Sequence, residues 1–249
     1  MPYNNEYRKL WKQAGYRTDM GSSATGEPPP SDKIRLYHLT TQEHAISNIA
    51  LRRIKVARFY DLNDPFELLA LNFKYGHVRK VVKEFKTAFD SAHGMLCFTA
   101  DWTSPVMWSH YAMKHRGICL GFDLPKTLVQ KVEYEDKRLL ETLGESEDPF
   151  GLSNELQNLL MRTKSKQWNY EEEYRMFVPL AEAIQQGNLY FKPLGNDITL
   201  VEVILGPNCE IALDEVRKLT ERNKYDAKVF KSRLAWKHFK VVPYESTVP

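Results

Sequence analysis

Short runs rich in Val, Ile, Leu and aromatic residues recur along the chain and restrict the fold more than any other feature. Strand chemistry is expected at residues 34–40, 54–58, 66–73, 95–100, 117–123, 170–178, 187–194, 198–206, 227–234 and 238–245. Helical spacing is expected at 41–53, 77–92, 104–115, 152–167 and 212–223. The two kinds of segment do not alternate regularly, and no Gly-rich phosphate loop occurs. The pattern therefore predicts an α+β fold and argues against Rossmann and P-loop folds.

The N-terminal region has a different composition from the rest of the chain. Residues 1–33 end in "GSSATGEPPPSDK", which is typical of a linker, so we expect an N-terminal arm there. The whole chain has 249 residues, of which 43% are hydrophobic and 12% aromatic. This is enough to bury one sizeable core, so residues 34–249 are expected to form a single α+β domain of catalytic type.

Charge, hydropathy and cysteine content limit the class of protein. The net charge is +3, from 35 basic and 32 acidic residues, which argues against a strongly basic nucleic-acid binder but leaves a local basic groove possible. No apolar run is long enough to cross a membrane and no secretion signal is present, so we expect a cytoplasmic protein. The three cysteines, Cys97, Cys119 and Cys209, are widely separated and lie in apolar runs, which predicts reduced, buried thiols. No metal site is expected.

The stretch "WNYEEEYRMFV" sets three consecutive carboxylates inside a run of strand type. Side chains alternate across a strand, so Glu171, Glu173 and Arg175 should share one face, while Tyr170, Tyr174 and Met176 point to the other, core-facing side. A solvated outer sheet face would have the same pattern. Glu172 fits neither face, and an irregularity at the strand end would leave it in solvent.

Three further segments carry candidate site residues, each with a structural alternative. His38 lies in "LYHLT", where an apolar strand more often holds a satisfied core or surface histidine. Asp61, Asp64 and Glu67 lie in "DLNDPFE", whose oxygen atoms suit a hard cation or simply build a turn. In "SPVMWSHYAMKH", Met107, Trp108 and Tyr111 are spaced for one helical face, which favours core packing over a pocket wall.

The order of these motifs resembles one class of enzymes. "LYHLTTQEHAISNIALRRIKVA" is similar to the first strand, helix and second strand of ADP-ribosyltransferases of the diphtheria-toxin and poly-ADP-ribose-polymerase type. "MLCFTADWTSPVMWSHYAMKHRGICLGFD" resembles their next strand, aromatic-bearing helix and following strand, and "EEYRMF" resembles the strand with the catalytic glutamate. The combined pattern over residues 34–210 also looks like a bacterial family of unknown function often found near phage-defence or toxin genes.

The resemblance implies a fold and a set of roles. The fold would have split, mixed or antiparallel sheets with flanking helices, and NAD would be the substrate. Glu173 would be catalytic, with Glu171 orienting or deprotonating the acceptor and His38 holding the adenosine-side ribose. Tyr111 would stack on nicotinamide. The remaining expected NAD-binding residues are Leu39, Asn63, Asp64, Trp108 and Arg175.

Two departures from the transferase pattern affect these expectations. Leu39 stands where the class usually has Gly after the histidine, at a point where backbone groups hold the nicotinamide amide. Cys97 stands where the first of two stacking tyrosines is usual, so Trp108 or Phe98 would have to replace that ring.

The functional hypothesis is an NAD-dependent ADP-ribosyltransferase or NAD glycohydrolase acting as a bacterial toxin or phage-defence effector. The acceptor would be a macromolecule, either protein or nucleic acid, or water. One alternative is a Mg²⁺-dependent nuclease or phosphoesterase with oxygen ligands from Asp61, Asp64, Glu67, Glu171 and Glu173. Another is a non-catalytic module that binds a nucleotide or a protein.

Overall fold

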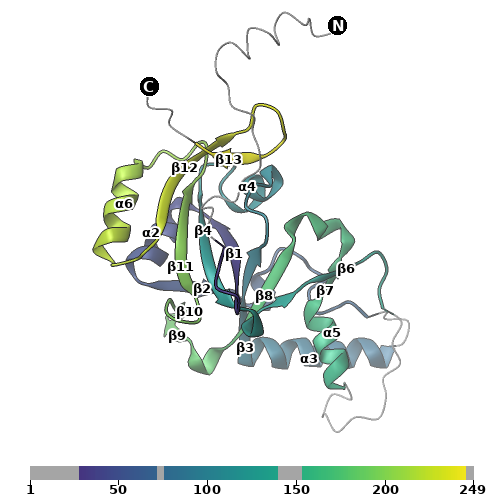
Figure 1. Ribbon diagram of the computed structural model, residues 1–249. Helices are drawn as coiled ribbons and strands as arrows, with labels where there is room; N and C mark the ends of the chain where they lie inside the picture. The colour runs from purple at the N-terminus through teal and green to yellow at the C-terminus, as the bar shows by residue number, and fades with distance from the viewer. Residues whose placement is uncertain (1–27, 72–75, 140–152, 245–249) are drawn as a thin grey trace, which may run out of the picture.

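The computed structural model describes residues 28–71, 76–139 and 153–244. Within them the chain is a mixed α+β structure, as the sequence predicts (Figure 1). A large sheet has eight strands in the order β13-β12-β11-β4-β1-β3-β8-β5, accompanied by a three-stranded sheet, β2-β10-β9, and a two-stranded sheet, β6-β7. The predicted arm at 1–33 lies mostly outside the described residues.

The large sheet is mainly antiparallel, with one parallel pair, β11 and β12. Its strands are β1 (Lys33–Thr40), β3 (His93–Thr99), β4 (Ile118–Pro125), β5 (Gln130–Lys131), β8 (Glu173–Pro179), β11 (Thr199–Leu205), β12 (Lys228–Leu234) and β13 (Val241–Pro243). The small sheets contain β2 (Arg53–Val56), β6 (Glu133–Glu135), β7 (Thr163–Ser165), β9 (Ile184–Gln186) and β10 (Leu189–Pro193).

The pairing of β1 differs strongly between its two neighbours. β1 and β4 pair at every position from Lys33↔Pro125 to Thr40↔Ile118. In the described residues, β1 and β3 pair at Tyr37↔Thr99. Thr99 is also opposite Glu173 on β8, so this row links the histidine-bearing strand to the glutamate-bearing strand. β1 therefore pairs with β4 along its whole length, whereas its described pairing with β3 is limited to one position.

Helices pack their apolar faces against side chains of the strands. The helices are α2 (Gln42–Ala50), α3 (Gly76–Ala92), α4 (Pro105–Tyr111), α5 (Asn154–Arg162) and α6 (Leu213–Arg222). Ala45 and Ile49 of α2 and Val216 of α6 join the main core with Leu36 and Phe122. Figure 1 shows α3 and α5 beside β3 and β8, at the other end of the molecule from α6. Their apolar faces meet in a separate cluster.

Several expected elements differ in extent; the helix expected at 104–115 ends at Tyr111, and the strand expected at 238–245 begins at Val241. The helix expected at 152–167 ends at Arg162, because residues 163–165 pair with β6 as β7. The strand expected at 66–73 is replaced in its described part by turns and an isolated bridge between Leu71 and Leu139. The strand expected at 170–178 begins three residues late, because Lys166–Glu171 forms a 3-10 helix, η3.

None of the described helices is long and apolar enough to span a membrane. All three cysteines are free; Cys119 and Cys209 are buried, whereas Cys97 is partly exposed. The burial of Cys119 and Cys209 agrees with the expectation, whereas Cys97 is less buried than expected.

Candidate functional site

A cavity of about 270 Å³ lies where β1 and β3 separate. β1 and β3 form part of its wall, and the end of α4 and the start of β8 close it. Six of the residues expected at the NAD site line it: His38, Leu39, Asn63, Tyr111, Glu171 and Glu173. Residues far apart in the sequence therefore meet around one hollow.

A backbone reversal at Glu172 turns two neighbouring glutamates inward. Glu172 has φ 43° and ψ 48°, a left-handed conformation, and its side chain is exposed. Glu171 ends η3 and Glu173 begins β8, and each is only 4% exposed. The expectation that Glu172 points into solvent is confirmed. The side chains of Glu171 and Glu173 share a side because of this kink, and not by strand alternation as predicted.

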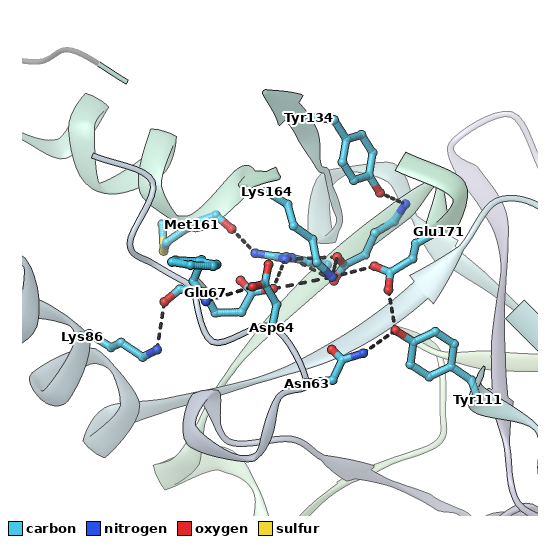
Figure 2. A network of polar contacts seen from close by, with 12 residues as sticks. Asn63, Asp64, Glu67, Lys86, Tyr111, Tyr134, Met161, Lys164 and Glu171 are labelled. Carbon is cyan, nitrogen blue, oxygen red and sulfur yellow. Dashed lines mark hydrogen bonds and ion pairs between the residues drawn. The ribbon is translucent and has the colours of Figure 1, made fainter. Parts of the chain in front are cut away.

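Figure 2 shows a buried ionic cluster, most of whose members also line the cavity. Lys164 Nζ donates to Glu171 Oε2 at 2.6 Å and to Glu173 Oε2 at 3.0 Å, and lies 3.6 Å from Glu67 Oε1. Arg175 donates through Nε to Glu173 Oε1 at 2.9 Å and through one terminal nitrogen to Glu67 Oε1 at 2.7 Å. We call these five residues the carboxylate cluster. The solvated-face alternative for Glu171, Glu173 and Arg175 is therefore wrong.

The cations of the carboxylate cluster keep Glu173 ionised. Burial alone would raise the pKa of the Glu173 carboxyl, but Arg175 and Lys164 outweigh burial and lower this pKa to about 2. Burial disfavours the charged form of Lys164, yet the carboxylates of Glu173, Glu67 and Glu171 raise its pKa above the usual value. With all five groups ionised, three carboxylates face two cations and the cluster carries one excess negative charge.

Glu67 is the least compensated member of the carboxylate cluster. Its side chain is 2% exposed, and its Oε2 has no hydrogen-bond partner among the described residues. Burial raises the pKa of the Glu67 carboxyl, and the negative charge of Glu173 raises it further. The positive charges of Arg175 and Lys164 oppose this increase. Lys86 Nζ fixes the segment by donating to the Glu67 carbonyl at 2.9 Å.

The segment before Glu67 is a turn whose side chains have separate roles. Asp64 Oδ1 accepts the Phe66 N–H at 2.9 Å, and Asp64 is buried away from the cavity wall. This supports the turn interpretation of Asp64. Asn63 instead donates through Nδ2 to the Tyr111 hydroxyl at 2.7 Å, and Asp61 also lines the cavity.

Tyr111 connects the cavity to the carboxylate cluster. Helix α4 begins with Ser104 as its N-cap and Pro105 in its first turn, and Tyr111 is its last residue. The Tyr111 hydroxyl donates to Glu171 Oε1 while accepting from Asn63. Burial, together with this bond to Glu171, raises the pKa of Tyr111 above its usual value. The phenol therefore stays protonated and orients the Glu171 carboxylate.

His38 lies on the opposite wall with a defined tautomer. Its Nδ1 is 3.0 Å from the Cys97 carbonyl oxygen, which can only accept, so Nδ1 carries the proton and Nε2 is an acceptor. Burial lowers the pKa of His38, although the bond to Cys97 opposes this effect. A neutral imidazole with a free acceptor nitrogen suits a ligand hydroxyl group.

Besides Asp64, two further predicted ligand contacts do not lie on the cavity wall. Trp108 is fully buried in the apolar cluster around α4, and its Nε1 donates to the Trp102 carbonyl at 2.6 Å. Arg175 is also fully buried and acts through Glu173 and Glu67. Phe98, in contrast, lines the cavity near His38, with ring centroids 6.2 Å apart.

Lys164 and Tyr134 are site residues that sequence reasoning missed. Lys164 was expected within a helix but belongs to β7, and the Glu173 N–H donates to the Tyr134 hydroxyl at 2.9 Å. The available signal for Lys164 was electrostatic: two adjacent buried carboxylates and one guanidinium require a further cation. That signal does not say which of the chain's many lysines supplies it.

Comparison with known proteins identifies a resemblance without an activity. Residues 107–176 match the model of a family described as "Protein of unknown function (DUF2971)". The matched segment contains Tyr111, Lys164, Glu171, Glu173 and Arg175. No curated protein and no solved structure matches the chain. The expected similarity to an uncharacterised family is thus confirmed over this segment, whereas the likeness to ADP-ribosyltransferases stays a prediction.

Proposed function

We propose that the protein cleaves the bond between nicotinamide and ribose in NAD, as an ADP-ribosyltransferase or an NAD glycohydrolase. The observation that carries the proposal is the convergence of His38, Tyr111, Glu171 and Glu173 on one cavity. These are the residues for which the transferase resemblance implies roles, and they come from β1, α4, η3 and β8.

The proposed reaction explains why anionic charge is concentrated beside a small hollow. The C–N bond to nicotinamide breaks with its electron pair going to the ring nitrogen, so neutral nicotinamide leaves and the ribose becomes an oxocarbenium-like cation. Glu173, ionised because of Arg175 and Lys164, provides negative charge close to that cation. An acceptor hydroxyl or water then bonds to the sugar carbon and gives its proton to Glu171.

The cavity size sets which part of NAD enters. Its volume of about 270 Å³ is slightly below the roughly 300–1,000 Å³ usual for small-molecule pockets. It therefore suits the nicotinamide and its ribose, with the adenosine end outside. Tyr111 supplies an aromatic wall for nicotinamide, and His38 Nε2 is a suitable acceptor for a ribose hydroxyl. The resemblance had placed His38 on the adenosine-side ribose, which fits this volume less well.

The carboxylate cluster supports preorganisation of the reacting groups. Lys164 bridges Glu171 and Glu173, and Tyr111 holds the other oxygen of Glu171. Both carboxylates are fixed before substrate arrives, so little reorganisation is needed during the reaction. Arg175 is a positioning residue in this scheme, because it bonds both oxygens of Glu173 without lining the cavity.

The Mg²⁺-dependent nuclease alternative has less support from the same geometry. Its proposed ligands Glu67, Glu171 and Glu173 already bond the ammonium group of Lys164 or the guanidinium of Arg175. A divalent ion would have to displace these cations or add to their repulsion. The non-catalytic binding module uses the same cavity and differs from the enzyme only in turnover.

The biological role follows the family resemblance. Cleavage of NAD or modification of a macromolecule would suit a bacterial toxin or phage-defence effector. The acceptor is then a protein, a nucleic acid or water.

The test is release of nicotinamide from NAD labelled in the nicotinamide ring. Wild type should release label with or without EDTA, and Glu173→Gln should lower the rate about 100- to 1,000-fold. Glu172→Gln is the matched control, because Glu172 is adjacent, chemically identical and exposed. It should retain the wild-type rate.

Each competing function predicts a different result. EDTA-sensitive cleavage of nucleic acid without nicotinamide release would favour the nuclease. NAD binding without turnover in any variant would favour the binding module. Equal nicotinamide release by wild type and Glu173→Gln would contradict the proposed role of the glutamate.

A further inference from the structure

The last β-hairpin carries a concentration of positive charge that the chain as a whole does not have. Residues 228–244, "KVFKSRLAWKHFKVVPY", contain no Asp or Glu. Their positive residues are Lys228, Lys231, Arg233, Lys237 and Lys240, which together exceed the net charge of +3 of the entire chain. The same segment contains Phe230, Trp236, Phe239 and Tyr244. Cations interleaved with aromatic rings are the composition of a nucleic-acid contact surface.

The connection between β12 and β13, residues 235–240, is held in a defined shape. Ala235 N–H donates to the Lys240 carbonyl at 2.9 Å and closes the connection. Lys240 N–H donates to the His238 carbonyl at 2.9 Å within it. Strand β13 is anchored from the other side, because Val241 N–H donates to the Thr103 carbonyl at 2.8 Å. We call residues 235–240 the hairpin tip.

The aromatic rings of the hairpin tip are directed to solvent. Trp236 is 65% exposed and Phe239 is 99% exposed. Lys237, His238 and Lys240, the other residues of the tip's apex, are exposed as well. Large exposed rings on a rigid element contribute little to the core, so their position points to an external partner.

We propose that the hairpin tip binds single-stranded nucleic acid, with bases stacked on Trp236 and Phe239 and phosphates contacted by Lys237 and Lys240. Unpaired bases offer flat faces for stacking, and the phosphates complement the cations. Paired bases in a duplex are stacked on each other and do not offer these faces.

An anionic membrane is the main competing partner, and the order of residues disfavours it. Membrane insertion needs a contiguous apolar tip, but Lys237 and His238 separate Trp236 from Phe239 at the apex. Burying either ring in lipid would bring these polar groups with it. Isolated rings flanked by cations suit successive nucleotides better.

Strand β13, at the edge of the large sheet, lies next to helix α4 (Figure 1). The Trp102 and Phe230 rings meet edge to face with centroids 6.0 Å apart, and Val241 belongs to the apolar cluster that also contains Trp108. Tyr111 packs against that cluster from the end of α4. Binding at the hairpin tip does not depend on the proposed NAD reaction and is tested without NAD.

The test is fluorescence anisotropy with labelled 20-nucleotide dT and rU strands, a DNA duplex of equal length, and phosphatidylserine-containing vesicles. Wild type should bind the single strands more tightly than the duplex or the vesicles. Trp236→Ala with Phe239→Ala should weaken binding by about 5- to 150-fold for each ring that stacks a base. Tyr60→Ala with Phe66→Ala removes two other exposed rings, 62% and 51% exposed, and should leave binding unchanged.

Salt dependence separates the contribution of the lysines from that of the rings. Lys237→Ala with Lys240→Ala should lower the slope of log affinity against log salt by about 1.4 if both contact phosphates. Lys80→Ala with Lys83→Ala is the control of equal charge change on the exposed face of α3. The ring variant should weaken binding without changing this slope.

The proposal is overturned by three results. These are no binding of single strands by wild type, binding that the hairpin variants leave intact, or binding of vesicles in preference to oligonucleotides. Unchanged thermal unfolding confirms that the variants fold. If the ring variant unfolds, Lys237→Glu with Lys240→Glu replaces it and must abolish binding.

Discussion

Two buried groups of charged residues in this protein have similar compositions but different surroundings. In the carboxylate cluster, Arg175 bonds Glu173 and Glu67, and Lys164 joins Glu171. In the second group, Arg35 bonds both oxygens of Asp123 at 2.8 and 3.0 Å and Glu202 at 3.3 Å. Both groups bury carboxylates beside an arginine.

The difference lies in which segments each group joins. Arg35 and Asp123 are direct partners on paired strands β1 and β4, and Glu202 lies on the next strand, β11. The carboxylate cluster instead joins a turn, β7, η3 and β8, and all its members except Arg175 line the cavity beside Tyr111. Ion pairs between adjacent strands have a structural role in the sheet. Charged residues from separate segments that meet around a cavity are instead candidate active-site residues. The predictions below test this contrast.

Arg175→Met should have the largest effect on stability. The substitution leaves Glu67 and Glu173 buried with one fewer cation, so we expect the free energy of unfolding to fall by about 3–5 kcal/mol. Arg35→Met should cost less, because the Arg35 side chain is 14% exposed and that of Arg175 is fully buried. Urea denaturation measures both. An equal or larger loss for Arg35→Met would remove the distinction between the two groups.

Acid should destabilise the protein through Glu173. Its folded pKa is lowered to about 2 from 4.5, so its stabilisation is fully present above pH 4.5 and is lost as the pH falls toward 2. The loss is on the order of 3 kcal/mol. Subtracting the unfolding free energies of Glu173→Gln from those of wild type at each pH isolates this contribution. A difference that does not change across this range would contradict the assigned ionisation.

Tyr111→Phe should reduce turnover while leaving the fold intact. It removes the hydroxyl that orients Glu171, a hydrogen bond to a charged group worth about 1.5–3 kcal/mol, or about 10- to 150-fold in kcat. Tyr170→Phe is the matched control, because the Tyr170 hydroxyl contacts His110 outside the cavity. Similar kcat values for the two variants would show that the Tyr111 hydroxyl is not used.

Glu67→Gln should have the smallest effect on stability, within about 1 kcal/mol near neutral pH. Burial raises the folded pKa of Glu67, so its ionisation opposes folding as the pH rises above 4.5. Wild type should therefore lose stability relative to Glu67→Gln between pH 5 and pH 8. Urea denaturation at the two values checks the sign, and a relative gain by wild type would reverse the assignment.

Much of the fold was predictable because it depends on local patterns. The α3 pattern, with Val82 and Phe85 now buried, needs only helical spacing, and the N-cap Ser104 and Pro105 mark the start of α4. Elements whose boundaries depend on distant partners were missed. Helix α5 ends early because Thr163–Ser165 pairs with β6, a contact that periodicity does not reveal.

The candidate site was predictable in part for the same reason. Motif order brought out His38, Tyr111, Glu171 and Glu173, all of which line the cavity. Trp108 shares the helix with Tyr111, and helical spacing does not distinguish Trp108, which faces the core, from Tyr111, which lines the cavity. The position of Lys164 depends on the path of the chain after α5, and the direction of the Glu172 side chain depends on its left-handed backbone conformation. Neither can be inferred from residue spacing.

The contrast between the two charged groups is tested most directly by nicotinamide release from NAD by Glu173→Gln and Asp123→Asn, compared at equal concentrations of folded protein. Asp123 is 6% exposed and Glu173 is 4% exposed, so both substitutions neutralise a buried carboxylate beside an arginine. The account predicts that Glu173→Gln loses about 100- to 1,000-fold in rate while Asp123→Asn keeps the wild-type rate. Equal rates for the two variants, or no release by wild type, would contradict it.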